Sequence, residues 1–148
     1  MIDYQQLKKN RLLIIFWMLT MVFLIVVSVI FLPIFREFLS GIFMITSGGL
    51  LIILGGGLIF FALQQKVKRK LKYFLLLTGV SGAGFFIFVF LHNLFYGLGS
   101  ITKEIVILSN LLKVLEVAFF LLAIIICPIA FLVGVIGSIA NNISSTGG

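Results

Sequence analysis

The feature that most constrains this chain is a cationic stretch in its middle. Residues 64–72 carry five Lys or Arg side chains, and the chain on either side is apolar for more than twenty residues. A Lys or Arg at the centre of a bilayer costs about 2.5–3.5 kcal/mol, so five together must stay in water. Short loops rich in Lys and Arg remain on the cytoplasmic side of a membrane. The stretch therefore predicts a cytoplasmic loop and fixes the direction of both flanking segments.

Four apolar segments are long enough to cross a bilayer, which takes about 20 helical residues. They cover residues 12–32, 39–63, 73–98 and 114–140 of a 148-residue chain that is 62% hydrophobic and 10% charged. A water-soluble fold of this composition would lack polar surface, and no connection is long enough to form an aqueous domain. We therefore expect an all-α membrane protein, residues 1–148 in one domain, with four transmembrane helices in two antiparallel hairpins.

The cations divide unequally between the two predicted faces. Eight of the 11 Lys and Arg residues lie in the N-terminal arm or the central stretch, and three lie in the outer connections. This bias predicts a multi-pass protein of the plasma membrane with both termini in the cytoplasm. The central cations are either a solvated charge run or a contact for anionic head groups of the inner leaflet, where each contributes about 1 kcal/mol. We expect no nucleic acid, because no domain would shape a groove around the run. The cations concerned are Lys66, Lys68, Arg69, Lys70 and Lys72.

Small residues recur every seven positions in the second segment, at Gly41, Gly48, Gly55 and Ala62. This spacing keeps side chains on one face of a left-handed helix pair, and small residues there let membrane helices approach closely. We interpret the series as a packing face. The run Gly55–Gly57 has a second interpretation, a hinge or an unwound segment of the kind that lines transporter sites.

A similar stripe runs along the fourth segment at alternating steps of three and four. Its members are Ala123, Cys127, Ala130, Gly134 and Gly137. We expect this stripe to pack against the second segment, with the third segment beside them and the first outermost. Pro128 lies in the middle of the stripe and is expected to kink the helix.

One polar cluster is expected at the outer face. His92, Asn93 and Tyr96 lie within about one helical turn, and Glu116 shares the heptad position of Ala123, which points into the bundle. These side chains form either an outward-facing pocket for a polar or cationic ligand or an interfacial cap that bonds only to head groups and neighbouring helices. Residues 101–112 lie on the outer surface or extend the fourth helix, because their apolar spacing fits both arrangements.

The chain offers no residue set for catalysis. One His, one Cys and four carboxylates are too scattered for a metal site, and one cysteine excludes a disulfide within the chain. The glycine triplet lacks the Lys-Ser/Thr of a phosphate-binding loop. No Asp or Glu lies deep in a span, where proton-coupled pumps place one. We therefore expect no enzyme, no metal and no cofactor.

Residues 71–97 and the fourth segment resemble parts of short prokaryotic four-helix membrane proteins of unassigned function, through their hydropathy and the run Leu91-His92-Asn93-Leu94. The resemblance implies a four-helix membrane fold and no activity. The small-residue stripes predict a non-enzymatic subunit or scaffold that packs against itself, as a homo-oligomer, or against a membrane partner. The alternative is a homo-oligomeric channel or small-solute transporter, with the second helix lining the path.

Overall fold

All regular structure in the described part of the chain is helical. The computed structural model describes residues 4–32, 41–102 and 104–143. Four stretches of these helices, Asn10–Phe31, Gly41–Gln64, Arg69–Ile101 and Val106–Asn141, are long and apolar enough to cross a membrane. The predicted all-α class with four such helices is therefore confirmed. The helices are α1 (Tyr4–Phe31), α2 (Gly41–Gln64), α3 (Arg69–Ile101), α4 (Val106–Leu121), the π-helical turn η2 (Leu122–Ile126) and α5 (Cys127–Ile143).

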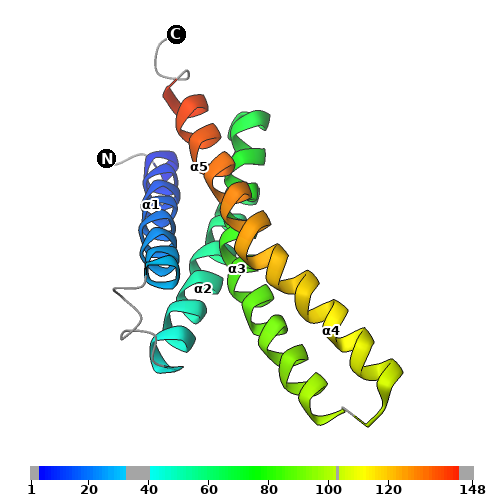
Figure 1. The fold of residues 1–148 in the computed structure, drawn as a ribbon. Helices are drawn as coiled ribbons and strands as arrows, with labels where there is room; N and C mark the ends of the chain where they lie inside the picture. The colour runs from blue at the N-terminus through cyan, green and yellow to red at the C-terminus, as the bar shows by residue number, and fades with distance from the viewer. Residues whose placement is uncertain (1–3, 33–40, 103, 144–148) are drawn as a thin grey trace.

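The central helix of the bundle is α3. Helices α2, α4 and α5 all pack along it, whereas α1 packs chiefly on α2 (Figure 1). The start of α1 and the end of α5 lie at the same end of the bundle. The expectation that the second and fourth segments pack on each other through their small residues is wrong, because α2 and α5 each pack on α3, with Gly48 and Gly55 of α2 and Gly134 and Gly137 of α5 at these contacts.

Helices α2 and α3 cross where both carry glycine. A Cβ atom at Gly55 would lie 2.7 Å from the carbonyl oxygen of Gly79, and one at Gly79 would lie 2.9 Å from the carbonyl oxygen of Gly55. No side chain fits at these separations, so the crossing requires glycine on both helices. The ring of Phe86 covers Gly48 in the same interface. The α2 packing face thus serves the contact with α3.

Helix α5 meets another face of α3 in a similar way. A Cβ atom at Gly134 would lie 2.5 Å from the hydroxyl oxygen of Thr78, and the ring of Phe74 covers Gly137. The buried Thr78 hydroxyl donates to the carbonyl of Phe74, at 2.9 Å, one turn back on its own helix. This bond satisfies the hydroxyl at a position that is fully buried. Glycines of α5 therefore let it approach the backbone of α3, as Gly55 of α2 does on another face.

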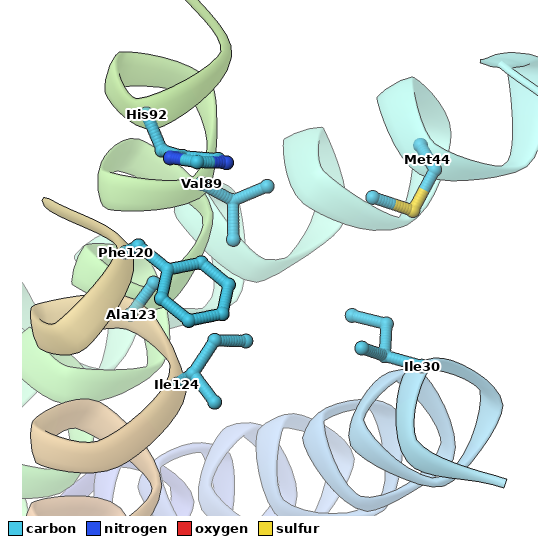
Figure 2. A pocket seen from close by; sticks show the side chains of 7 residues that line it. All are labelled: Ile30, Met44, Val89, His92, Phe120, Ala123 and Ile124. Carbon is cyan, nitrogen blue, oxygen red and sulfur yellow. The ribbon is translucent and has the colours of Figure 1, made fainter. Parts of the chain in front are cut away.

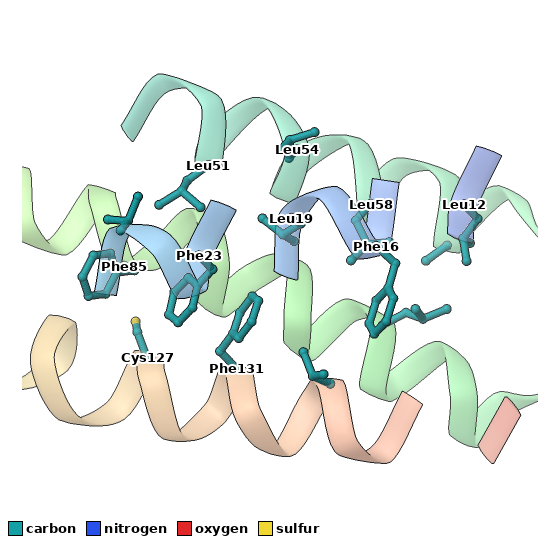
Figure 3. Packing of buried hydrophobic residues seen from close by; sticks show 14 residues of the cluster. Leu12, Phe16, Leu19, Phe23, Leu51, Leu54, Leu58, Phe85, Cys127 and Phe131 are labelled. Atoms are coloured by element: carbon teal, nitrogen blue, oxygen red, sulfur yellow. The ribbon is translucent and has the colours of Figure 1, made fainter. Parts of the chain in front are cut away.

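Large side chains of α1 fill the space between the other helices. The ring of Phe23 stacks on Phe131 of α5, with centroids 3.8 Å apart, and meets Phe85 of α3 edge-on at 5.4 Å (Figure 3). The sequence predicts an outermost first helix; its far face is indeed exposed, but one seam lies in the core. The buried hydrophobic residues of this seam are Leu12, Phe16, Leu19, Phe23, Val26 and Val29.

A π-helical turn precedes Pro128. The backbone N–H of Cys127 donates to the carbonyl of Leu122, five residues back instead of four. Pro128 has no N–H, and in a regular α-helix its ring would collide with the carbonyl of Ile124. Widening the turn moves that carbonyl away from the ring. The disturbance that the sequence predicts at Pro128 therefore takes the form of one π turn in an otherwise continuous helix.

Helices α3 and α4 reach beyond their predicted ends. Because α3 continues to Ile101 and α4 begins at Val106, most of the ambiguous stretch 101–112 extends the fourth helix. The spans of 33 and 36 residues are about 50 and 54 Å long, against about 30 Å of hydrocarbon in a bilayer. Their far ends diverge from those of α1 and α2 (Figure 1). Arg36 and Lys103, two of the three cations that the sequence places in the outer connections, lie outside the described residues.

Candidate functional site

A pocket of about 180 Å³ lies where one helix pair, α1 and α2, diverges from the other, α3 and α4. Ile30 and Met44 line it from α1 and α2, and the other lining side chains face them from α3, α4 and η2 (Figure 2). We call it the lateral pocket. Every lining residue belongs to a helix that is apolar enough to cross a membrane. The lining consists of Ile30, Met44, Val89, His92, Phe120, Ala123 and Ile124.

His92 is the one lining residue with a polar side chain. Its Nδ1 lies 3.1 Å from the backbone carbonyl oxygen of Glu116 on α4. A carbonyl only accepts hydrogen bonds, so Nδ1 carries the proton and donates it. In the neutral ring Nε2 is then an acceptor, and no described residue donates to it. His92 therefore ties α3 to α4 and has a free acceptor.

The aromatic rings of His92 and Phe120 form one wall of the pocket. Their centroids are 5.3 Å apart, and the planes are tilted by 51°. Figure 2 shows both rings reaching from α3 and α4 toward the space that Ile30 and Met44 border from the other side. A tilted pair at this distance is a favourable aromatic arrangement. The wall is thus held by a ring contact as well as by the hydrogen bond of His92.

The structure brings together only part of the predicted polar cluster. His92 lines the lateral pocket, whereas Asn93 and Tyr96 are exposed and lie outside the lining. The side-chain amide of Asn93 donates to the carbonyl of Val89 on its own helix, at 2.8 Å. Glu116 contacts His92 through its backbone carbonyl and not through its carboxylate. The convergence of four polar side chains that the sequence suggests is replaced by one imidazole among apolar residues.

Sequence reasoning missed the other residues of the lining. An Ile, Val or Phe beside a pocket looks the same in a sequence as one that faces lipid, so these positions carry no signal. His92 did carry a sequence signal, because an imidazole within an apolar segment needs hydrogen-bond partners from neighbouring helices.

Most of the predicted packing residues lie at helix contacts. Gly41 is the exception, because it is exposed and a Cβ atom there would meet nothing within 4 Å. The run Gly55–Gly57 is helical throughout, which favours packing over an unwound hinge. Ala130 and Gly137 are half-buried. The remaining members are buried: Gly48, Gly55, Ala62, Ala123, Cys127 and Gly134.

A second pair of glycines on α2 faces away from α3. A Cβ atom at Gly49 or Gly56 would meet nothing within 4 Å. Ile53 and Phe60, which are 71% and 58% exposed, alternate with them at steps of four and three. These four residues share one side of the helix. We call them the open glycine face of α2.

The cationic stretch is part loop and part helix. Because α3 begins at Arg69, three of its five cations lie in the first turn of that helix, which has no acidic residue. The ammonium of Lys72 donates to the carbonyl of Leu63, at 3.2 Å, in the last turn of α2. Arg69 lies against Tyr73, with its Nη2 3.4 Å from the hydroxyl. A helix N-terminus and exposed cations both favour an anion at this end of the bundle. The exposed members are Lys66, Lys68, Arg69 and Lys70.

Comparison of the chain with protein-family models, with curated proteins and with solved structures found no match.

Proposed function

We propose that this chain is a non-enzymatic, multi-pass subunit of the cell membrane. It packs through the open glycine face of α2 against a membrane helix of a second copy or of a partner protein. The observation that carries the proposal is the open space at Gly49 and Gly56. Glycine weakens a helix by up to about 1 kcal/mol relative to alanine. Nothing within the described chain requires a small residue at either position, so a second helix is the simplest reason for them.

Helix α2 itself provides the comparison. Its inner glycines, Gly48 and Gly55, are seven apart and admit α3. The outer pair, Gly49 and Gly56, has the same spacing, which suits a left-handed helix pair. By contrast, residues 12–32 contain no Gly or Ala, and the exposed face of α1 carries large apolar side chains such as Ile14, Met21 and Ile25. A helix face that meets only lipid therefore has no need of glycine in this protein.

The open glycine face also has projections and hollows against which a second helix can pack. Ile53 and Phe60 project on either side of Gly56, so large and small positions alternate along one line. Membrane helices associate through close packing, because lipid tails remove the hydrophobic driving force between them. Alternating projections and hollows supply such packing. A channel with α2 lining its path has less support, because residues 48–63 contain no polar side chain.

The proposal also assigns a direction in the membrane. The start of α1, the end of α5 and the cationic stretch are placed in the cytoplasm, in keeping with the rule that Lys and Arg stay inside. Four exposed cations, two in the loop before α3 and two in its first turn, then face the inner leaflet. Anionic head groups there would be stabilised by about 1 kcal/mol for each cation.

Cross-linking in native membranes tests the packing face. In a Cys127→Ser background, Gly56→Cys is expected to form a cross-linked species, at twice the chain mass for self-association or at another mass for a partner. Gly97→Cys is the matched control, because Gly97 is an open glycine on α3 with nothing within 4 Å of a Cβ atom. Cross-linking of Gly56→Cys no stronger than that of Gly97→Cys would rule out the proposed interface.

A further inference from the structure

We infer that the lateral pocket binds the ring of an apolar, hydroxyl-bearing molecule from the bilayer, a phenol or quinol, whose hydroxyl donates a hydrogen bond to Nε2 of His92. This inference does not depend on the open glycine face of α2, which takes no part in the pocket lining.

The volume of the pocket fits one six-membered ring. A cavity of about 150 Å³ lined by Leu, Ile and Phe binds benzene. The lateral pocket is slightly larger, at about 180 Å³. It therefore holds one ring with small substituents, and a longer chain on that ring has to extend between the two helix pairs into lipid.

The lining favours an aromatic ring over a straight chain. Phe120 and His92 offer ring faces on one side, and Met44 offers a thioether on the other (Figure 2). Aromatic rings gain about 0.5–1.5 kcal/mol from tilted or stacked partners beyond their buried area, and thioethers add similar contacts.

The pocket lining has no charged side chain that could pair with a charged head group. The lining contains no Lys or Arg to hold an anionic head group and no Asp or Glu to hold a cationic one. An unpaired charge in such a site costs far more than a neutral polar group. The occupant is therefore neutral at the end that enters the pocket.

The hydrogen-bonding state of His92 selects a donor. Because Nδ1 is committed to the carbonyl of Glu116, Nε2 is left as an acceptor without a described partner. A ligand O–H can donate to this acceptor, whereas an ether or a ketone cannot. A phenolic hydroxyl meets this need and the ring fills the space.

The access route agrees with an occupant from the bilayer. All seven lining residues lie on membrane-crossing stretches, so a molecule dissolved in lipid reaches the pocket between the diverging helix pairs (Figures 1 and 2). Because the lining comes from both pairs, a bound ring would hold them at a fixed separation.

The test uses the full chain in lipid nanodiscs with ¹⁵N-labelled histidine. His92 is the one histidine of the sequence, so its imidazole resonances need no assignment. The probes are 4-propylphenol, its methyl ether and a straight-chain alcohol of equal carbon number. We expect the phenol to shift the Nε2 resonance saturably and to bind about two- to tenfold more tightly than the ether, the range of one neutral hydrogen bond.

Each comparison can overturn the inference. Equal affinity of phenol and ether would show that the ligand makes no hydrogen bond to Nε2. Equal affinity of phenol and straight-chain alcohol would show that the pocket does not select a ring. If no probe shifts the Nε2 resonance saturably, the pocket is not a binding site for these molecules. These outcomes are measured on the unmodified chain and do not depend on whether a variant folds.

Two matched variants locate the binding. Ala123 is buried in the lining, so Ala123→Leu fills the pocket and is expected to abolish saturable binding of a fluorinated phenol followed by its ¹⁹F resonance. Ala118 is exposed on α4, and Ala118→Leu is expected to leave binding unchanged. In His92→Phe, phenol and ether should bind equally. Unchanged binding in Ala123→Leu would place the ligand elsewhere and contradict the inference.

Discussion

The replacement of Gly55 by alanine tests how closely α2 and α3 approach. The new methyl would lie 2.7 Å from the carbonyl oxygen of Gly79 and 3.1 Å from the backbone nitrogen of Ala83. Neither backbone atom can rotate away, so the two helices have to separate. A gap of about 0.5–1 Å already forfeits a quarter to a half of the dispersion attraction at a contact.

The size of the effect follows from two opposing contributions. Overfilling a well-packed site costs about 1–3 kcal/mol, and alanine in place of glycine returns up to about 1 kcal/mol through helix propensity. We expect Gly55→Ala to lower the free energy of unfolding by about 1–2 kcal/mol, which raises the population of the opened bundle by about 5- to 30-fold. Gly57→Ala is the matched control, because a Cβ atom at Gly57 meets nothing within 4 Å.

Cys127 provides the assay without further substitution. It is the one cysteine of the chain and is 4% exposed, so a thiol reagent reaches it only when the bundle opens. In mild detergent the labelling rate follows the open population, provided that opening and closing are fast relative to labelling. Labelling should be about 5- to 30-fold faster in Gly55→Ala than in the unmodified chain, and unchanged or slower in Gly57→Ala. Equal rates in the two variants would refute the close approach of α2 and α3.

Three further predictions concern the core and the cationic end. Phe131→Ala removes a fully buried ring that stacks on Phe23 of α1, and it should lower the free energy of unfolding by about 3–5 kcal/mol. In a titration with a denaturing detergent, helicity should be lost at a lower detergent concentration. Leu132→Ala, at an exposed position, should shift the midpoint much less, and equal shifts in the two variants would contradict the packing. Lys72→Met loses the bond to the last turn of α2 and should cost about 0.5–1.5 kcal/mol in the same titration, whereas Lys70→Met, at an exposed position, should cost little. A reporter fused after Lys70 should be active in the cytoplasm, and activity outside the cell would invert the proposed direction.

The number and approximate position of the helices followed from composition. Apolar runs interrupted by a five-cation stretch leave few other arrangements, so four membrane-length helices were predictable. Their ends were less so, because hydropathy falls at Gly97–Asn110 while the helical backbone continues to Ile101 and resumes at Val106. Polar residues at a membrane surface lower the apolar signal without ending a helix.

Helix partners were harder to predict than helix faces. The seven-residue spacing identified Gly48 and Gly55 as packing positions, but it does not name the helix that they meet. That choice depends on Thr78 and Gly79, which bring small groups to two sides of α3 without any repeat in the sequence. The lateral pocket was beyond sequence reasoning for the same reason, since it exists only where residues of four segments meet around His92.

The π turn before Pro128 bears on how this chain tolerates changes in length. A single residue added to a regular α-helix turns everything after it by about 100°, which would move a packed face toward lipid. Residues 122–126 already hold the equivalent of one such insertion. If one residue is deleted there and the proline is replaced, the π turn can become a regular α-helical turn. Both halves of the fourth helix then keep their contacts with α3. Elsewhere in that helix the same deletion would rotate one half out of register.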